Sequence, residues 1–243
     1  MIARFSEALH LLGRHIGLFA AIILTVWLPG NILLNYVAYN VEGLSDMGFL
    51  KLTMWIEGIF GPLYIGALVH SLYQIKTGRP VTYREAMTVG LKNWGALFGA
   101  RLVAGFLMGL GLIALVIPGL ILAVRYSLLD AAVIIENKGA SESRARSTEL
   151  TIGCRWQIFW SAIIFAILFM SLSFIVYLPL GLIESLNTMP IEIVLDCILD
   201  IAYAVIQIVI FLFYWESTQA NTHAEPSPSL YSEPEAGSEY GKA

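Results

Sequence analysis

Long apolar runs alternate with short polar segments along most of the chain. Runs of about 20 apolar residues can cross a bilayer as helix, and strand-like alternation of apolar and polar positions is absent from them. Because lipid tolerates no unpaired backbone groups, the pattern predicts an all-α polytopic membrane protein with about six transmembrane helices and interfacial amphipathic helices. The expected spans are residues 16–39, 52–73, 95–117, 118–136, 156–178 and 190–214.

Three of these spans follow a short segment that carries basic residues. In residues 1–15 the apolar positions recur three and four residues apart, which is typical of a helix lying on the membrane surface, although an extension of the first span is an alternative. Weak matches between the segments are Glu7 with Glu85, Ala8 with Ala86, Gly17 with Gly95, Arg84 with Arg146 and Trp94 with Trp156. They predict three repeated units, each an entry helix and a hairpin of two spans, unless they reflect only the usual composition of interfacial segments.

Proline and glycine positions make further local predictions. Pro29 and Gly30 predict a kink or break in the first span. Gly105 and Gly109 have the spacing that lets membrane helices approach closely. The third and fourth spans are expected to join tightly at Ile117–Pro118.

Composition supports a membrane protein. Apolar residues make up 58% of the chain and charged residues 13%, against about 25% charged in soluble domains. The net charge of −4 equals that of residues 216–243, which hold five Glu and one Lys, so the remainder gives no reason to expect a nucleic-acid partner. We therefore expect a six-helix domain over 1–215 and a disordered acidic cytoplasmic tail over 216–243.

Lysine and arginine positions predict the orientation. Basic residues concentrate in the N-terminal segment and in residues 74–95 and 137–155, and they are scarce in residues 40–51 and 179–189. The positive-inside rule then predicts a multi-pass protein of the bacterial inner membrane with both termini in the cytoplasm. The basic segments also contain tryptophan, which is typical of contact with the lipid bilayer and anionic lipid headgroups.

Ionisable residues inside the spans are the candidate functional residues. Each costs about 2.5–3.5 kcal/mol on insertion scales, so each is expected to have a partner or a function. In the sixth span Glu192, Asp196 and Asp200 recur every four residues and form a stripe on one helix face. The depth of Arg125 matches that of Asp196 within about 2 Å, which predicts a pair with Asp196 or Asp200.

A second pair is predicted between Arg101 and Asp130, which lie at similar depths from the cytoplasmic side. Two interpretations of these charges stay open. They are either structural ion pairs that fix helix packing or a pathway for a proton, a cation or a substrate.

Enzyme and metal motifs are not found in the sequence. There is no nucleophile elbow, zinc-protease motif, P-loop or dinucleotide fingerprint in the context that each requires. The four histidines lack metal-ligand spacing, and the two cysteines do not indicate a disulfide framework. We therefore expect no catalytic residues, no metal and no cofactor.

One stretch resembles a known group of bacterial membrane proteins. The residues that carry the resemblance are Pro118, Gly119, Leu120, the run 122–125, Glu136, Ser147, Leu150 and Trp156. The stretch is similar to the glycerophosphoryl diester phosphodiesterase membrane domain and to related uncharacterised inner-membrane proteins. In fused members the resemblance implies a separate catalytic barrel, which this chain has no room for, so no catalytic residue carries over.

Three functions follow as expectations. The first is a non-catalytic inner-membrane protein that organises the envelope or acts as an accessory to another membrane protein. The alternative is a small permease that uses the acidic residues of the sixth span. A membrane-embedded enzyme acting on lipid is the third.

Overall fold

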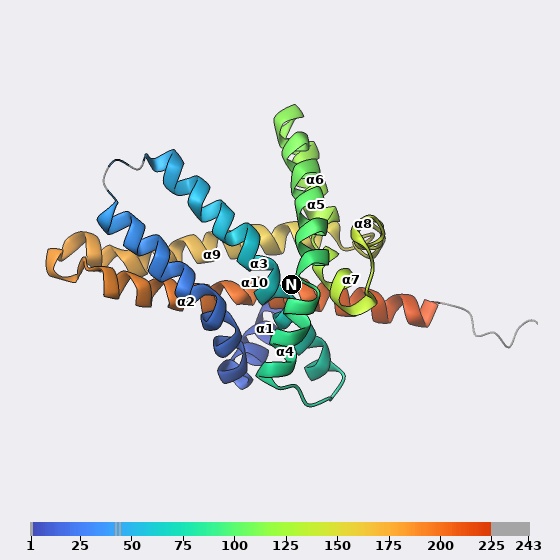
Figure 1. The fold of residues 1–243 in the computed structure, drawn as a ribbon. Helices are drawn as coiled ribbons and strands as arrows, with labels where there is room; N and C mark the ends of the chain where they lie inside the picture. The colour runs from blue at the N-terminus through green and yellow to red at the C-terminus, as the bar shows by residue number, and fades with distance from the viewer. Residues whose placement is uncertain (1, 42, 44, 225–243) are drawn as a thin grey trace, which may run out of the picture.

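Helices form all the regular structure in the part of the chain that the computed structural model describes, residues 2–41, 43 and 45–224. In chain order they are α1 (Ile2–Arg14), α2 (Ile16–Asn40), α3 (Asp46–Lys76), α4 (Tyr83–Lys92), α5 (Trp94–Ala114), α6 (Val116–Arg125), α7 (Leu129–Glu136), α8 (Ala140–Leu150), α9 (Arg155–Leu182), the 3₁₀ turn η1 (Glu184–Leu186) and α10 (Met189–Ala224). Figure 1 shows their arrangement.

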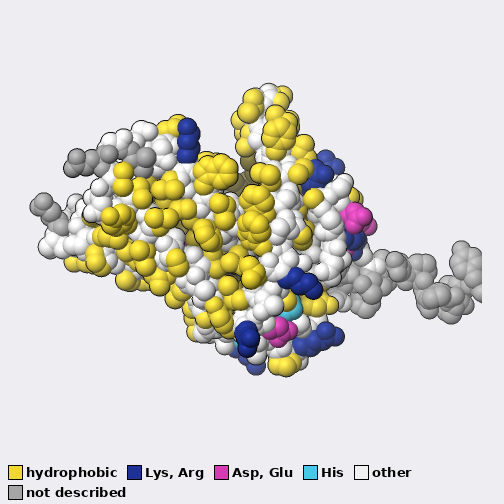
Figure 2. Space-filling view, in the orientation of Figure 1, with side chains coloured by type: hydrophobic (Ala, Val, Ile, Leu, Met, Phe, Trp, Pro, Cys, Tyr) yellow, Lys and Arg dark blue, Asp and Glu magenta, His cyan; other side chains and the backbone are white. Residues whose placement is uncertain are grey.

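Six stretches of the described chain are long and apolar enough to cross a membrane. Five are the long helices α2, α3, α5, α9 and α10, and α6 and α7 together form the sixth, Val116–Glu136. The chain is therefore an all-α, multi-pass membrane protein, as the hydropathy pattern predicts. Apolar side chains cover much of the outer surface (Figure 2), including Ile113, Met170 and Phe174, which are 84%, 72% and 68% exposed. Such a surface suits lipid, which solvates apolar side chains.

The same order of elements occurs three times. The short helices α1, α4 and α8 each lead into a long helix after a brief interruption, at His15, at Asn93 and at residues 151–154. Each long helix is followed by a second membrane-length stretch. This succession of an entry helix and a helical hairpin agrees with the three units predicted from the weak internal matches.

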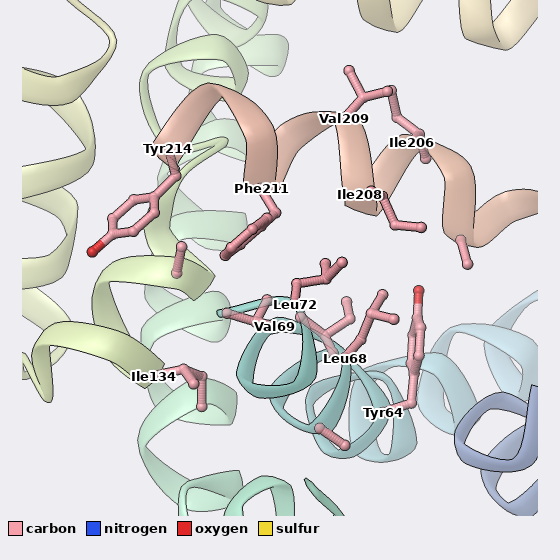
Figure 3. Packing of buried hydrophobic residues seen from close by; sticks show 14 of the residues in the cluster. Tyr64, Leu68, Val69, Leu72, Ile134, Ile206, Ile208, Val209, Phe211 and Tyr214 are labelled. Atoms are coloured by element: carbon pink, nitrogen blue, oxygen red, sulfur yellow. The ribbon is translucent and has the colours of Figure 1, made fainter. Parts of the chain in front are cut away.

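The hydrophobic core lies where α3 meets α10. Leu68 and Leu72 of α3 are fully buried and lie opposite Ile208 and Phe211 of α10 (Figure 3). Ile134 of α7 belongs to the same cluster. Contacts with α2, α4, α5, α7 and α10 make α3 the central helix of the bundle.

The short entry helices gather near the end of the bundle where α3 and α10 end. Arg4 of α1 donates to Glu216 of α10 at 2.6 Å, and Lys76 at the end of α3 pairs with Glu7. Apolar residues Ala8 and Leu12 of α1 are buried, whereas Ile2 and Leu9 are exposed. The contact between Arg4 and Glu216 places the beginning of α1 and the end of the sixth span on the same side.

Close helix packing in the hairpin of α5 and α6 depends on other glycines than those predicted. A Cβ added at Gly105 or Gly109 would meet no atom within 4 Å. A Cβ at Gly119 would instead lie 2.5 Å from Leu112 Cγ, and one at Gly111 would lie 3.0 Å from the Gly119 backbone. The hairpin projects beside the other helices (Figure 1), and its tight turn lies at Leu115, close to the predicted junction.

Four expectations about where helices begin, break or end differ from the structure. The second span begins six residues earlier than expected, because α3 begins at Asp46 with Ser45 as its N-cap. The fourth span is broken between α6 and α7 at residues 126–128, immediately after Arg125. Pro29 does not break the first span, and α2 continues through it. Residues 216–224, assigned to the disordered tail, continue α10 because no proline lies between Pro190 and Pro226 and Glu216 is tied to Arg4. The rest of the predicted tail, 225–243, lies outside the described residues.

Candidate functional site

A ladder of hydrogen bonds joins α2 to α10 along the acidic stripe. Asn31 Nδ2 donates to Asp200 Oδ2 at 2.7 Å, Asn35 Nδ2 to Asp196 Oδ2 at 2.8 Å, and Tyr39 Oη to Glu192 Oε1 at 2.8 Å. The donors are four residues apart on α2, and the acceptors are four residues apart on α10. Positions spaced by four share one helix face, so the antiparallel helices bring the two stripes together rung by rung.

The two central carboxylates differ in their hydrogen bonds. Both oxygens of Asp196 are used, since Oδ1 also accepts from Tyr177 Oη of α9. Only Oδ2 of Asp200 accepts a hydrogen bond from the described residues. Both amide donors, Asn31 and Asn35, are more than nine-tenths buried. The amides therefore orient the carboxylates without neutralising them, and Asp200 keeps an oxygen for another partner.

These acids line a cavity of about 730 Å³ between α2, α3 and α10. From α3, Glu57 lines it opposite the ladder, and Arg101 of α5 and Phe169 of α9 complete its wall. We call this the acidic cleft, after its four carboxylates, Glu57, Glu192, Asp196 and Asp200. None of the four forms an ion pair with a described residue.

The basic residue of the cleft is already paired. Arg101 Nε and Nη2 donate to the two carboxylate oxygens of Asp130 at 2.8 and 2.7 Å. This two-pronged geometry is the strong form of an arginine–carboxylate contact. The pair predicted from depth is therefore present, and it joins α5 to α7. The positive charge of Arg101 is balanced by Asp130, so it does not neutralise the cleft.

The predicted pair of Arg125 with Asp196 or Asp200 is wrong. Asp196 and Asp200 bond to α2 and α9, whereas α6, which ends at Arg125, packs against α5, α8 and α9. Equal depth in the membrane does not fix which helices are neighbours. Arg125 forms no ion pair with a described residue, and its Nε is buried without a hydrogen-bond partner.

The helix break after Arg125 is closed by a serine of α8. The buried Ser147 Oγ donates to Arg125 O at 2.7 Å and accepts from Leu128 N at 3.1 Å. A broken helix inside an apolar span leaves backbone groups without partners, and such groups are costly in lipid. One hydroxyl satisfies a group on each side of the break.

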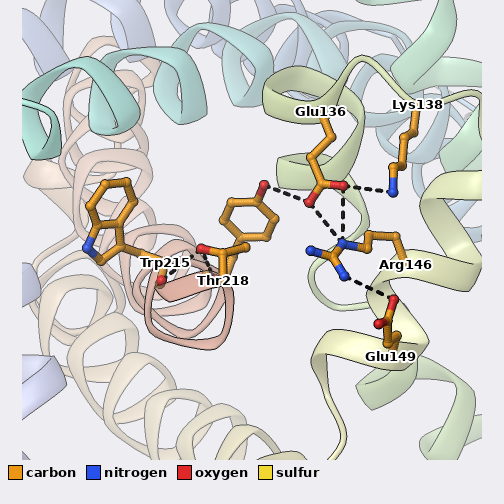
Figure 4. Close-up of polar contacts among 7 residues, drawn as sticks. Glu136, Lys138, Arg146, Glu149, Trp215 and Thr218 are labelled. Carbon is orange, nitrogen blue, oxygen red and sulfur yellow. Dashed lines mark hydrogen bonds and ion pairs between the residues drawn. The ribbon is translucent and has the colours of Figure 1, made fainter. Parts of the chain in front are cut away.

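A second polar cluster ties α7, α8 and α10 together (Figure 4). Glu136 accepts hydrogen bonds from Arg146 at 3.1 Å, Tyr214 at 3.0 Å and Lys138, whose Nζ lies 2.9 Å away. Arg146 also donates to Glu149 at 3.0 Å. Burial disfavours the charged form of Arg146, but its bonds to Glu149 and Glu136 outweigh this and raise its pKa. Because every charge in the cluster is paired, it serves to fix these helices.

The hydrogen-bond donors on α2 were not predicted, although the sequence contains a pattern that could have indicated them. Asn31, Asn35 and Tyr39 recur every four residues in the first span, with the same period as the acids of the sixth. Matching these two polar stripes would have predicted that α2, rather than α6, is the partner of the acidic stripe. Tyr177 gave no comparable signal, since a tyrosine near the end of a span is ordinary.

Three carboxylates of the cleft are spread along the ladder, and the fourth, Glu57, comes from α3. In the described part of the chain, no group of three or more His, Cys, Asp or Glu residues is arranged to hold a metal ion. Comparison with protein-family models, curated proteins and solved structures finds no match to this chain. Its function is therefore inferred from the geometry of its own residues.

Proposed function

We propose that this chain is a small permease that binds a cationic solute in the acidic cleft. The observation that carries the proposal is the presence of four carboxylates around one cavity without an ion-pair partner among the described residues. Uncompensated carboxylates are costly within a membrane and mark ion or proton pathways. A bound cation, or a proton when the cleft is empty, would offset that cost.

The size and lining of the cleft suit a small organic cation. Its volume of about 730 Å³ lies within the range of about 300–1,000 Å³ that is typical of small-molecule sites. Aromatic side chains of Trp27, Tyr64, Phe169 and Tyr203 accompany the carboxylates. Aromatic faces attract organic cations, and this adds selectivity to charge attraction.

The two interpretations of the intramembrane charges apply to different residues. Arg101 and Asp130 form a paired, structural contact between helices. The cleft carboxylates have hydrogen-bond donors but no countercharge, which favours the pathway interpretation for them. The acidic ladder therefore supports transport more than it supports a purely structural role.

We further propose that the protein lies in the bacterial inner membrane with both termini in the cytoplasm. The lysine and arginine residues of the entry helices α1, α4 and α8 supply the positively charged side. The ion pair of Arg4 with Glu216 supports a common side for both ends. Reporter fusions at residue 2 and after residue 224 would both report the cytoplasm, and opposite reports would contradict the topology.

An accessory role is a second candidate, favoured by the α5–α6 hairpin. This hairpin projects beside the bundle (Figure 1) and its visible surface is largely apolar (Figure 2). Its exposed large apolar side chains include Leu102, Phe106 and Ile113. Such a projection would fit a groove of another membrane protein that the chain organises or supports. A stable partner that is lost on Phe106→Ser substitution would favour this candidate.

Binding of ethidium, an aromatic cation, to detergent-solubilised protein tests the permease proposal. We expect fluorescence anisotropy to show saturable binding that weakens at least tenfold in Asp200→Asn and recovers in Asp200→Glu. The matched control is Asp46→Asn, which removes an exposed carboxylate outside the cleft. Equal binding by wild type, Asp200→Asn and Glu57→Gln, all with native gel-filtration profiles, would contradict the proposal.

A further inference from the structure

A second cavity of about 530 Å³ lies between the α5–α6 hairpin and the helices α9 and α10. Its walls are mainly apolar and include Met108, Leu120, Ile158 and Ile210. Arg101 and Gln207 line both this cavity and the acidic cleft, so they mark the boundary between the two. We call the second space the apolar cavity.

One buried polar group in the wall of the apolar cavity has no partner. Ser161 of α9 is 2% exposed, and its Oγ makes no hydrogen bond. A serine in a membrane helix ordinarily bonds to the carbonyl one turn earlier, as Ser171 does with Ile167 O at 2.8 Å. The unpartnered hydroxyl of Ser161 is therefore suited to a polar group that enters the cavity.

Two arginines flank the apolar cavity near α8. Arg155 lies three and four residues before Ile158 and Phe159, which line the cavity, so the three share one face of α9. Val124 and Tyr126, on either side of Arg125, also line it. Both arginines are held beside α8.

The contacts with α8 are adjacent in sequence. Ser147 Oγ donates to Arg125 O at 2.7 Å, and Arg155 Nη2 donates to Thr148 O at 3.2 Å. Neither arginine forms an ion pair with a described residue. The Nε of each is buried without a hydrogen-bond partner. Neither arginine lines the apolar cavity itself, but both lie close in sequence to residues that do. An anion that carries an apolar portion would suit two unpaired cations beside an apolar space.

We propose that the apolar cavity binds an acyl chain of an anionic glycerophospholipid, whose phosphate lies between Arg125 and Arg155. The rise of a helix places Ser161 about 9 Å from Arg155 along α9. The polar headgroup layer of one leaflet is about 5–7 Å thick, so this step leads from the phosphate to the edge of the hydrocarbon layer. There Ser161 Oγ donates a hydrogen bond to an ester carbonyl of the lipid.

Charge and apolar lining together distinguish this lipid from other occupants. Inorganic phosphate or glycerol 3-phosphate would satisfy the arginines but leave the apolar walls uncovered. A zwitterionic phospholipid would fill the cavity but bring a positive group towards two arginines. An anionic phospholipid satisfies both, since guanidinium groups bind phosphate strongly and the tail covers the walls.

Native mass spectrometry of delipidated full-length protein tests the proposal with phosphatidylglycerol, phosphatidylethanolamine and glycerol 3-phosphate as probes. We expect one phosphatidylglycerol to bind at least tenfold more tightly than phosphatidylethanolamine. Glycerol 3-phosphate in hundredfold excess should leave this complex intact. The Arg125→Ala/Arg155→Ala variant should lose the preference, whereas Arg79→Ala, which removes an exposed arginine elsewhere, should keep it.

A second variant tests the cavity itself without removing a charge. Ala162 lines the apolar cavity and is exposed, so Ala162→Leu adds bulk there without disturbing the core. We expect it to weaken phosphatidylglycerol binding at least fivefold while the gel-filtration profile stays native. Unchanged binding in both variants, equal binding of the zwitterionic lipid, or displacement by glycerol 3-phosphate would each overturn the proposal.

Discussion

The guanidinium of Arg101 donates two parallel hydrogen bonds to the carboxylate of Asp130, at 2.8 and 2.7 Å. The pair joins α5 to α7 at the boundary between the acidic cleft and the apolar cavity, and both residues line the latter. It therefore holds the broken fourth span against the third. The arrangement makes a specific prediction about stability.

Loss of either partner should destabilise the protein more than loss of both. Breaking a buried pair leaves one charge uncompensated and costs about 3–5 kcal/mol, and the partial exposure of Arg101 places the expected value at about 2–3 kcal/mol. Thermal unfolding in detergent should show lower midpoints for Arg101→Met and Asp130→Leu than for the double variant. Additive losses in this double-mutant cycle would show that the pair contributes no coupling energy.

The hydroxyl of Ser147 should be needed to keep the break between α6 and α7 in its native form. Ser147→Ala removes the donor to Arg125 O and the acceptor for Leu128 N, both at a fully buried position. Leaving buried backbone groups unsatisfied costs about 1–3 kcal/mol. We expect a lower unfolding midpoint, while Ser141→Ala on the exposed face of α8 leaves it unchanged. Equal midpoints for the two variants would show that the break is stabilised in another way.

The sequence alone was enough to predict a multi-pass helical membrane protein, because that prediction depends only on the length and hydropathy of each apolar run. Length and hydropathy of each run predict the six membrane-length stretches directly, and most boundaries lie within a few residues of those predicted. The break after Arg125 could not be predicted in this way. No proline or glycine lies there, and its stabilising contact comes from Ser147, distant in sequence.

The lateral arrangement of helices was the least predictable property. Depth alone correctly paired Arg101 with Asp130, whose helices are neighbours, and wrongly paired Arg125 with the acids of α10. Depth is a one-dimensional coordinate, whereas contact requires the helices to be adjacent and their faces to point towards each other. Matching polar periods, as between Asn31 and Asp200, carries that additional information.

Gly90 should be required for the contact of α3 with α4. A Cβ added there would lie 2.5 Å from Leu63 O and 3.0 Å from Ala67 N, both backbone atoms that cannot rotate away. Gly90→Ala should therefore separate α4 from α3 and lower the unfolding midpoint by several degrees, since overpacking costs about 1–3 kcal/mol. Gly99→Ala is the matched control, because a Cβ there meets no atom within 4 Å. A midpoint for Gly90→Ala equal to or above that of the control would contradict the close approach.

The thiol of Cys154 should react slowly at neutral pH. Burial raises the pKa of Cys154, which precedes α9, above that of a free thiol. Since the thiolate is the nucleophile, alkylation by iodoacetamide should become fast only at a higher pH than in the same chain unfolded in detergent. A Cys197→Ser background leaves Cys154 as the single cysteine.

The raised pKa of Cys154 also makes the free energy of unfolding depend on pH, because the native state retains the thiol proton to higher pH than the unfolded state. The contribution of the Cys154 thiol to stability is complete below the unfolded pKa of about 8.5 and is lost as the pH rises through the native pKa. The hydroxyl of Ser217 lies 3.9 Å from the sulfur and lowers the pKa of Cys154, so Ser217→Ala should move the pH midpoint of alkylation further upward. A pH midpoint at or below that of the unfolded chain would contradict a buried thiol.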